Sequence, residues 1–254
     1  MKIIAVTNQK GGVGKTTTAV NLASGLSLNG QSVLLVDLDP QGNATMGVGI
    51  NKGQLQQKSV YPMLLGMASL ADVVVRSEQR GFDVLPANRE LAGAEVEIVN
   101  MTQREQRLKK SLQGETYDYV IIDCPPSLSL LTLNGLCAAS GIIIPMQCEY
   151  YALEGLVDLV NTMRMVYKSA NPELEILGLL RVMFDSRSIL SRHVSEQLRI
   201  HYGEKVFSTV IPRNIRLAEA PGYGMPGLFF DRSSKGAQAY LQFAQEVLLR
   251  TRGS

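Results

Sequence analysis

A glycine-rich segment near the amino terminus constrains the fold of this chain more than any other feature. It runs from Lys10 to Thr17 with the sequence Lys-Gly-Gly-Val-Gly-Lys-Thr-Thr and follows the short apolar run Ile3–Val6. Glycines let successive backbone N–H groups turn inward toward phosphate oxygens, and a following helix adds the positive potential of its amino end. The pattern therefore predicts a strand, a phosphate-binding loop and a helix that begins near Lys15.

The residue types in this loop favour a nucleoside triphosphate with Mg²⁺. Lys15 would reach the β- and γ-phosphates, and the hydroxyl of Thr16 would ligate the metal. The common pattern G-x-x-x-x-G-K-[ST] requires glycine at position 9, where this chain has Gln9, and the variant carries an additional lysine, Lys10. The loop residues expected to contact the nucleotide are Lys10, Gly11, Gly12, Gly14, Lys15, Thr16 and Thr17.

The hydrophobic pattern predicts an α/β fold. Four apolar runs are continuous rather than alternating, which is typical of parallel strands buried on both faces. They are Ile3–Val6, Val33–Val36, Val120–Ile122 and Ile142–Ile144. Apolar residues recur at helical spacing in the intervening sequence and again near the carboxyl terminus. Repeated β–helix–β units indicate a doubly wound, mostly parallel sheet flanked by helices, and residues 1–254 are expected to form one domain.

Acidic residues follow two of the expected strands. Asp123 comes directly after Val120–Ile122, and Asp37 and Asp39 follow the second strand. Ligands bind at the carboxyl edge of open α/β sheets, and a phosphate site needs carboxylates to position the metal and the attacking water. Asp39 precedes Pro40, so simple turn chemistry is an alternative explanation for that residue.

Composition excludes some classes of protein. Hydrophobic residues make up 45% and charged residues 19% of the 254 residues, as in a soluble protein with a large core. There is no run of 18 apolar residues, and the amino-terminal apolar stretch is too short for a signal peptide, so we expect a cytoplasmic protein. The three cysteines show no C-x-x-C spacing, which favours reduced thiols.

Positive charge is concentrated in one part of the chain. The net charge is only +2, yet the stretch Arg181–Arg216 carries seven basic and three acidic residues, a local excess of +4. A solvated surface explains such a stretch, and so does contact with a polyanion.

Five segments together resemble the ParA-type partition ATPases, called Soj in chromosomal systems. The resemblance spans residues 1 to about 249 and is closest to the short chromosomal type, because no DNA-binding domain precedes the first strand. The segments are Lys10–Thr17, Val36–Asn43, Tyr119–Ser127, Gln147–Leu156 and Thr209–Ala220.

The resemblance implies a P-loop NTPase fold of the deviant Walker A type and a set of catalytic roles. Lys10 would reach the phosphates of the nucleotide held by the other subunit of an ATP-dependent homodimer. Asp39 would orient or activate the attacking water, and Asp123 would hold the metal through water. With Lys15, these residues form the expected catalytic set.

The resemblance also implies binding surfaces and partners. Pro212 and Asn214 would line the adenine pocket, and Arg187 and Arg216 match DNA-contacting positions of the family. Both arginines lie in the basic stretch, which favours DNA contact for that stretch. The implied protein is a nucleoid-associated ATPase that binds double-stranded DNA without sequence preference and is stimulated by a ParB-type partner, with no stable membrane association.

Two departures and three alternatives accompany this hypothesis. Met225 stands where relatives often carry a basic residue, and Asn51–Arg80 matches only loosely.

A membrane-cycling regulator of MinD type would need a carboxyl-terminal helix with bulky apolar residues opposite lysines. Gly236–Arg250 instead carries glutamines there and is expected to cover the sheet. An iron–sulphur carrier would need paired cysteines, and only Cys124 adjoins Asp123. The third alternative is a protein cluster as the cargo.

Overall fold

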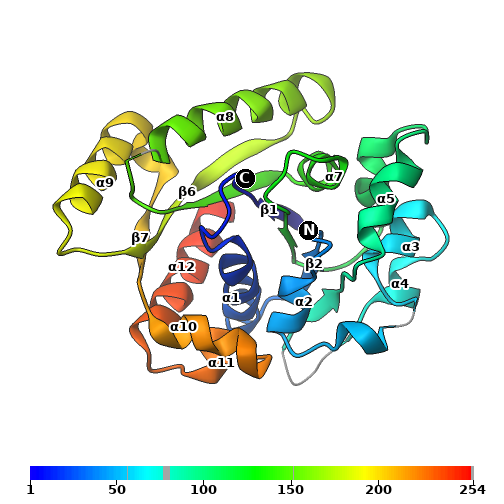
Figure 1. Cartoon of the computed structure of the whole chain (residues 1–254), viewed down its shortest axis with the longest axis horizontal. Coiled ribbons are helices and arrows are strands. Elements are labelled where there is room, and N and C mark those ends of the chain that lie inside the picture. The colour runs from blue at the N-terminus through cyan, green and yellow to red at the C-terminus, as the bar shows by residue number, and fades with distance from the viewer. Residues whose placement is uncertain (56, 77–80, 151, 253–254) are drawn as a thin grey trace.

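The fold was obtained as a computed structural model (Figure 1). The structure describes residues 1–55, 57–76, 81–150 and 152–252. Tyr151, within the family-like segment Gln147–Leu156, lies outside the described residues, as do residues 56 and 77–80 of the loosely matching segment.

Within the described residues, seven strands form one parallel sheet. Its spatial order is β3-β2-β4-β1-β5-β6-β7. The strands are β1 (Lys2–Val6), β2 (Val33–Asp37), β3 (Asp83–Leu85), β4 (Tyr119–Asp123), β5 (Gly141–Met146), β6 (Glu175–Phe184) and β7 (Val206–Pro212). The chain winds from β1 toward β2 and β3 on one side and returns through β4 before it continues to β5, β6 and β7 on the other. The segment after β1 therefore lies where the winding direction reverses, which is where open α/β sheets bind ligands.

Helices cover both faces of the sheet (Figure 1), as the sequence predicts. One face carries α1 (Lys15–Leu28), α2 (Asn43–Gly47), α10 (Ile215–Glu219), α11 (Gly227–Phe230) and α12 (Lys235–Thr251). The other carries α3 (Val60–Leu65), α4 (Leu70–Val73), α5 (Leu91–Ile98), α6 (Arg107–Ser111), α7 (Leu130–Ala138), α8 (Ala152–Ser169) and α9 (Ile189–Tyr202). Single 3₁₀ turns are η1 (Lys52–Gln54), η2 (Arg104–Gln106), η3 (Gly203–Lys205) and η4 (Ala220–Tyr223).

Alternation along the strands assigns side chains to two separate cores. Ala5 of β1 contacts the core under α3 to α9, whereas its neighbours Ile4 and Val6 contact the core under α1 and α12. Because both faces are covered, the strands are continuously apolar, and this explains why four of them were visible as apolar runs. β3, β6 and β7 were not among the expected strands, and in β6 the apolar run is interrupted by Arg181.

The contact between α1 and α12 fixes the helix that follows the glycine-rich loop. A Cβ atom at Gly25 of α1 would lie 2.7 Å from the Cβ of Ala244 of α12, so only glycine permits this approach. The hydroxyl groups of Thr18 and Tyr240 are 3.0 Å apart and hydrogen-bonded in the same interface. The expectation that the carboxyl-terminal helix covers the sheet is confirmed, since α12 contacts β7 as well as α1.

Candidate functional site

The glycine-rich loop adopts the conformation expected for phosphate binding. Gly12 and Gly14 have φ angles of +72° and +73°, in the left-handed region that favours glycine. Cβ atoms built at Gly11 and Gly12 would meet no atom within 4 Å, so this part of the loop borders open space. Gly14 occupies the N-cap position of α1 and has no side chain to bond the first N–H groups of the helix. The backbone therefore presents N–H groups to a site that suits an anion.

Side chains from neighbouring segments hold the loop in place. Asn8 donates from Nδ2 to the carbonyl oxygen of Pro145 (2.8 Å) and accepts from the N–H of Lys10 (3.0 Å). Gln147, which follows β5, donates from Nε2 to the carbonyl oxygen of Gly12 (3.0 Å). Sequence reasoning gave Gln147 no role of its own, although the residue lies in one of the family-like segments.

Lys15 lies at the centre of the site. Lys15 is only 8% exposed, and its Nζ donates to the carbonyl oxygen of Lys10 (3.1 Å). Burial lowers the pKa of Lys15, and the nearby carboxyls of Asp123 and Asp39 oppose that shift. The structure thus brings together Lys15 and the two acidic residues expected beside it.

Asp123 carries a buried carboxyl group with unmet bonding capacity. It ends β4, where it pairs in register with Val6 of β1 and with Asp37 of β2. Neither oxygen has a hydrogen-bond partner of regular geometry. Burial, followed by the charge of Asp37, raises its pKa well above the usual range, while the hydroxyl of Thr16 lies near enough to oppose the shift. An unpartnered buried carboxyl beside a hydroxyl fits a hydrated Mg²⁺ ion, which prefers oxygen ligands and keeps several waters.

Asp37 has a different environment from its neighbour Asp39. Its Oδ2 accepts from the N–H (2.8 Å) and the hydroxyl (2.7 Å) of Thr45, and its Oδ1 accepts from the N–H of Asp39 (3.1 Å). Burial raises the pKa of Asp37 to about 6, although these hydrogen bonds oppose the shift. The Thr45 hydroxyl in turn accepts from the N–H of Ala87 (2.9 Å). Asp37 therefore fixes the segment that carries Asp39, which is itself half-buried and accepts from the N–H of Gln41 (2.9 Å).

Pro212 and Asn214 lie beside the loop. They line a cavity of about 170 Å³ whose wall also includes Gly14 and Thr17. The side chain of Asn214 also accepts from the N–H of Leu217 and so caps α10. Met183 lines this cavity too, with a φ of +49°, which is unusual for a residue with a side chain. Nothing in the sequence pattern marked Met183, because backbone strain leaves no sign in residue type.

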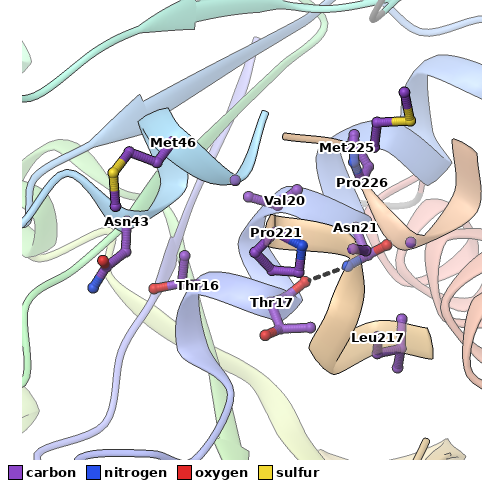
Figure 2. Close-up of a pocket in the computed structure, with 13 residues that line it drawn as sticks. Thr16, Thr17, Val20, Asn21, Asn43, Met46, Leu217, Pro221, Met225 and Pro226 are labelled. Atoms are coloured by element: carbon purple, nitrogen blue, oxygen red, sulfur yellow. Dashed lines mark hydrogen bonds between the residues drawn. The ribbon is translucent and has the colours of Figure 1, made fainter. Parts of the chain in front are cut away.

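Thr17 also lines a second cavity, of about 320 Å³ (Figure 2). Thr16 and Thr17 stand at its edge, Met46 of α2 forms one wall, and Pro221 forms another. Within α1, Nδ2 of Asn21 donates to the carbonyl oxygen of Thr17 (2.8 Å), the bond drawn in Figure 2. The cavity connects the start of α1 with the segment that follows Asp39.

The arginines expected to bind DNA line neither cavity. Arg187 is an ion-pair partner of Asp185 (3.1 Å), and its side chain is 90% exposed. Arg216 pairs with Glu219 (3.0 Å) and with Asp231 (3.4 Å).

The basic stretch is not all surface. Arg181 is 6% exposed, so part of the local charge excess lies inside the fold.

The cysteines are buried and free. Burial raises the pKa of the Cys137 and Cys148 thiols to about 11 and that of Cys124 still further. Such protonated, inaccessible thiols do not suit the iron–sulphur alternative, which needs exposed thiolates.

The loop between β1 and α1, with a buried acid at the end of β4, defines a P-loop nucleotide-binding protein. A family model described as an AAA domain matches residues 1–176. The Soj protein of Bacillus subtilis, a sporulation initiation inhibitor, is 52% identical over 97% of this chain and 98% of its own length. The chromosome partitioning protein ParA of Caulobacter vibrioides is 46% identical over 99% and 96%. The chain therefore belongs to the ParA/Soj family of chromosome-partitioning ATPases.

A solved structure agrees with this fold. The cobyrinic acid a,c-diamide synthase of Mycobacterium smegmatis, with a bound ATP analogue and magnesium, is 41% identical and superimposes with a TM-score of 0.84 over 98% of this chain and 94% of its own. Its name states a biosynthetic reaction, but its fold is the one described above. Among the described residues of the present chain, no helix is both long and apolar enough to cross a bilayer.

Proposed function

We propose that this chain is an ATP-hydrolysing switch that partitions a chromosome or plasmid. ATP joins two subunits, the dimer binds double-stranded DNA without sequence preference, and a ParB-type partner stimulates hydrolysis and release. The observation that carries the ATPase assignment is the unpartnered, buried carboxyl of Asp123 beside the loop and Thr16. The partition assignment rests on kinship with ParA and Soj proteins along nearly the whole chain.

The phosphate loop binds the triphosphate. Backbone N–H groups of Gly11, Gly12 and Gly14 donate to the phosphate oxygens, and the Lys15 ammonium neutralises part of their charge. Thr17, the last residue of the loop, lines both adjoining cavities. The adenine occupies the cavity of about 170 Å³ that Pro212 and Asn214 line. Its lining shares Gly14 and Thr17 with the loop, so a nucleotide can span both.

Thr16 and Asp123 hold the metal, Thr16 directly and Asp123 through water. When bound, Mg²⁺ neutralises charge that develops on the phosphates. Asp123 supplies the counter-charge, and its two oxygens are available because neither has a hydrogen-bond partner of regular geometry.

Asp39 orients or activates the attacking water. It stands at the half-buried rim of the site, on the segment that Asp37 fixes through the Asp39 N–H. Lys10 of one subunit completes the site of the other, so an isolated subunit lacks part of the positive charge that phosphoryl transfer requires. Slow basal turnover and stimulation in the assembled complex follow from that arrangement.

DNA contact is assigned to Arg187 and Arg216 on the outer surface. If each subunit neutralises about two phosphates, a monomer binds weakly and a dimer doubles the contacts. Nucleotide then controls DNA binding through dimerisation, and the protein works in the cytoplasm on the nucleoid.

The MinD-like alternative receives no support from α12. Its apolar residues Tyr240, Phe243 and Val247 are buried against the fold, and Leu249 is the single large apolar residue of α12 that is exposed, which is too little for a membrane-binding face. A protein cluster as cargo would use the same site and the same cycle.

The decisive experiment uses Asp39→Ala, which is expected to trap the ATP dimer. Electrophoretic shifts on random duplexes should show binding with ATP and much weaker binding with ADP, and the binding should fall steeply with salt. Lys15→Ala, which should not bind nucleotide productively, is the matched control. Equal DNA binding with ADP and ATP would refute the gating, and a trapped dimer that ignores DNA would favour protein cargo.

A further inference from the structure

A groove of about 700 Å³ lies at the outer edge of the sheet, beside β7. β7 runs between α9 and α12 there (Figure 1). The groove is lined by β7 residues between Val206 and Val210, whereas Ile211 and Pro212, which follow them, line the proposed adenine cavity. The groove shares no lining residue with either cavity near the glycine-rich loop.

Arg181 lines the groove from β6 and is itself 6% exposed. Its Nη1 donates to the Ser195 hydroxyl (2.9 Å), and its Nη2 donates to the carbonyl oxygens of Phe207 (2.7 Å) and Ser208 (3.2 Å). All three acceptors are neutral, and Nε has no partner. In the part of the chain that the structure describes, Arg181 forms no ion pair. A buried charge without a counter-charge is costly unless an anion compensates it.

Arg250 of α12 also lines the groove, but its charge is compensated. It pairs with Glu246 one turn earlier (3.0 Å) and lies 4.0 Å above the centre of the Phe207 ring. The Glu246 carboxylate also accepts from the N–H groups of Ser208 (2.7 Å) and Thr209 (2.8 Å) at the irregular edge of β7. Glu246 is therefore engaged by other groups. Its charge opposes the lowering of the Arg181 pKa, but it forms no ion pair with Arg181.

Arg199 is the exposed base on the opposite wall, near the end of α9. It forms no ion pair with any described residue. After burial, the charge of Arg199 is among the causes that lower the pKa of Arg181, so the two guanidinium groups repel each other across the groove. Exposed Glu204 is the acid among the lining residues, and Glu196 lies one turn before Arg199 on α9. Neither of these acids forms an ion pair with the two arginines.

We propose that this groove is a phosphate-binding site, separate from the nucleotide site. The Arg199 guanidinium contacts the oxyanion, since its forked donors match phosphate geometry, and Arg181 adds positive charge from the floor. Two sources carry the same chemistry: free inorganic phosphate and the phosphodiester backbone of a nucleic acid.

The test is calorimetric titration of the full chain with inorganic phosphate in saturating Mg·ADP, which occupies the glycine-rich loop. Sodium chloride at matched ionic strength is the reference, and the titration is repeated in Lys15→Ala, whose loop is disabled. Arg199→Gln should weaken phosphate binding by at least about fivefold. Arg192→Gln removes the same charge from the same helix two turns earlier, outside the groove lining, and should leave phosphate binding unchanged. Both side chains are exposed, so both variants should keep the fold.

The outcomes separate the proposal from its alternatives. If sodium chloride produces the same heat as phosphate, the proposal is wrong. It is also wrong if Arg199→Gln binds phosphate as tightly as the unmodified protein. A short random duplex then identifies the source. If the ATP-loaded Asp39→Ala protein binds duplex more weakly with Arg199→Gln than with Arg192→Gln, the backbone phosphate is the ligand. If duplex binding is equal and only phosphate binding falls, the ligand is the free ion.

Discussion

The ammonium group of Lys10 lies 2.5 Å from Oε2 of Glu149, an ion pair that joins the glycine-rich loop to the segment after β5 of the same chain. Both side chains are about half exposed. The backbone carbonyl of Lys10 meanwhile accepts from Nζ of Lys15. Both lysines of the loop are therefore engaged within their own chain, and Lys10 can reach a partner's nucleotide only after it leaves Glu149.

Lys10→Ala should bind ATP but remain monomeric. The substitution removes the charge that is proposed to act on the partner's phosphates and leaves Lys15 and the loop glycines in place. Sedimentation with ATP measures the association, and nucleotide binding in the same sample shows that the loop is intact. Normal dimerisation of this variant would mean that Lys10 is a solvated loop residue.

Glu149→Gln should strengthen ATP-dependent dimerisation by at most about fivefold, because an exposed ion pair contributes little and is screened by salt. The effect should shrink at high salt and disappear in a Lys10→Ala background, which makes a double-mutant cycle the appropriate measurement. Weaker dimerisation of Glu149→Gln would instead show that Glu149 itself contacts the nucleotide or the partner subunit.

Asp39→Ala should keep nucleotide binding and dimerisation and lose turnover. Asp39 stands at the rim, and its removal leaves Lys15, Thr16 and Asp123 unchanged. Phosphate release in the presence of DNA and a ParB-type protein should fall to the background measured without enzyme. Hydrolysis at the unmodified rate would show that Asp39 is only a turn residue before Pro40.

The buried carboxyl of Asp37 should make the nucleotide-free protein less stable as pH rises from about 4 to about 6. Its pKa is about 6 in the fold against 3.8 in the unfolded chain, so the folded state binds more protons in that interval. The free energy of unfolding therefore decreases with pH there, by up to about 3 kcal/mol. Urea denaturation at several pH values should show this slope, and Asp37→Asn should reduce it. A slope that is the same in both proteins would assign the titration to other groups, with Asp123 the first candidate because its raised pKa acts in the same direction.

The sequence predicted those parts of the fold whose cause is local. Continuous apolar runs marked β1, β2, β4 and β5, and glycines marked the loop, because burial on both faces and left-handed backbone each demand particular residue types. β6 was missed because buried Arg181 resembles a surface residue in sequence.

The candidate site likewise contains residues that the sequence pattern predicted and residues that it did not. The placement of Lys15 and Asp123 followed from their positions after strands. The roles of Met183 and Gln147 depend on contacts between segments distant in sequence, such as the bond from Gln147 to Gly12. Such contacts arise only when β5 and β1 are paired, so no local pattern reveals them.

Replacing Arg187 and Arg216 together with alanine should weaken DNA binding uniformly across sequences and reduce its dependence on salt. Each arginine already has a carboxylate partner, Arg187 in Asp185 and Arg216 in Glu219 and Asp231, so contact with phosphate must compete with these exposed pairs. Asp185→Asn frees Arg187 without removing it and should therefore strengthen DNA binding slightly, so it serves as a control that changes binding in the opposite direction.

Neither change should affect ATP-dependent dimerisation, because Arg187 and Arg216 line neither cavity beside the loop. The measurement is filter binding of the ATP-loaded Asp39→Ala dimer over a range of salt concentrations. If the double substitution leaves both affinity and salt dependence unchanged, the DNA surface lies elsewhere, and Arg199 of α9, which pairs with no acid among the described residues, becomes the next residue to replace.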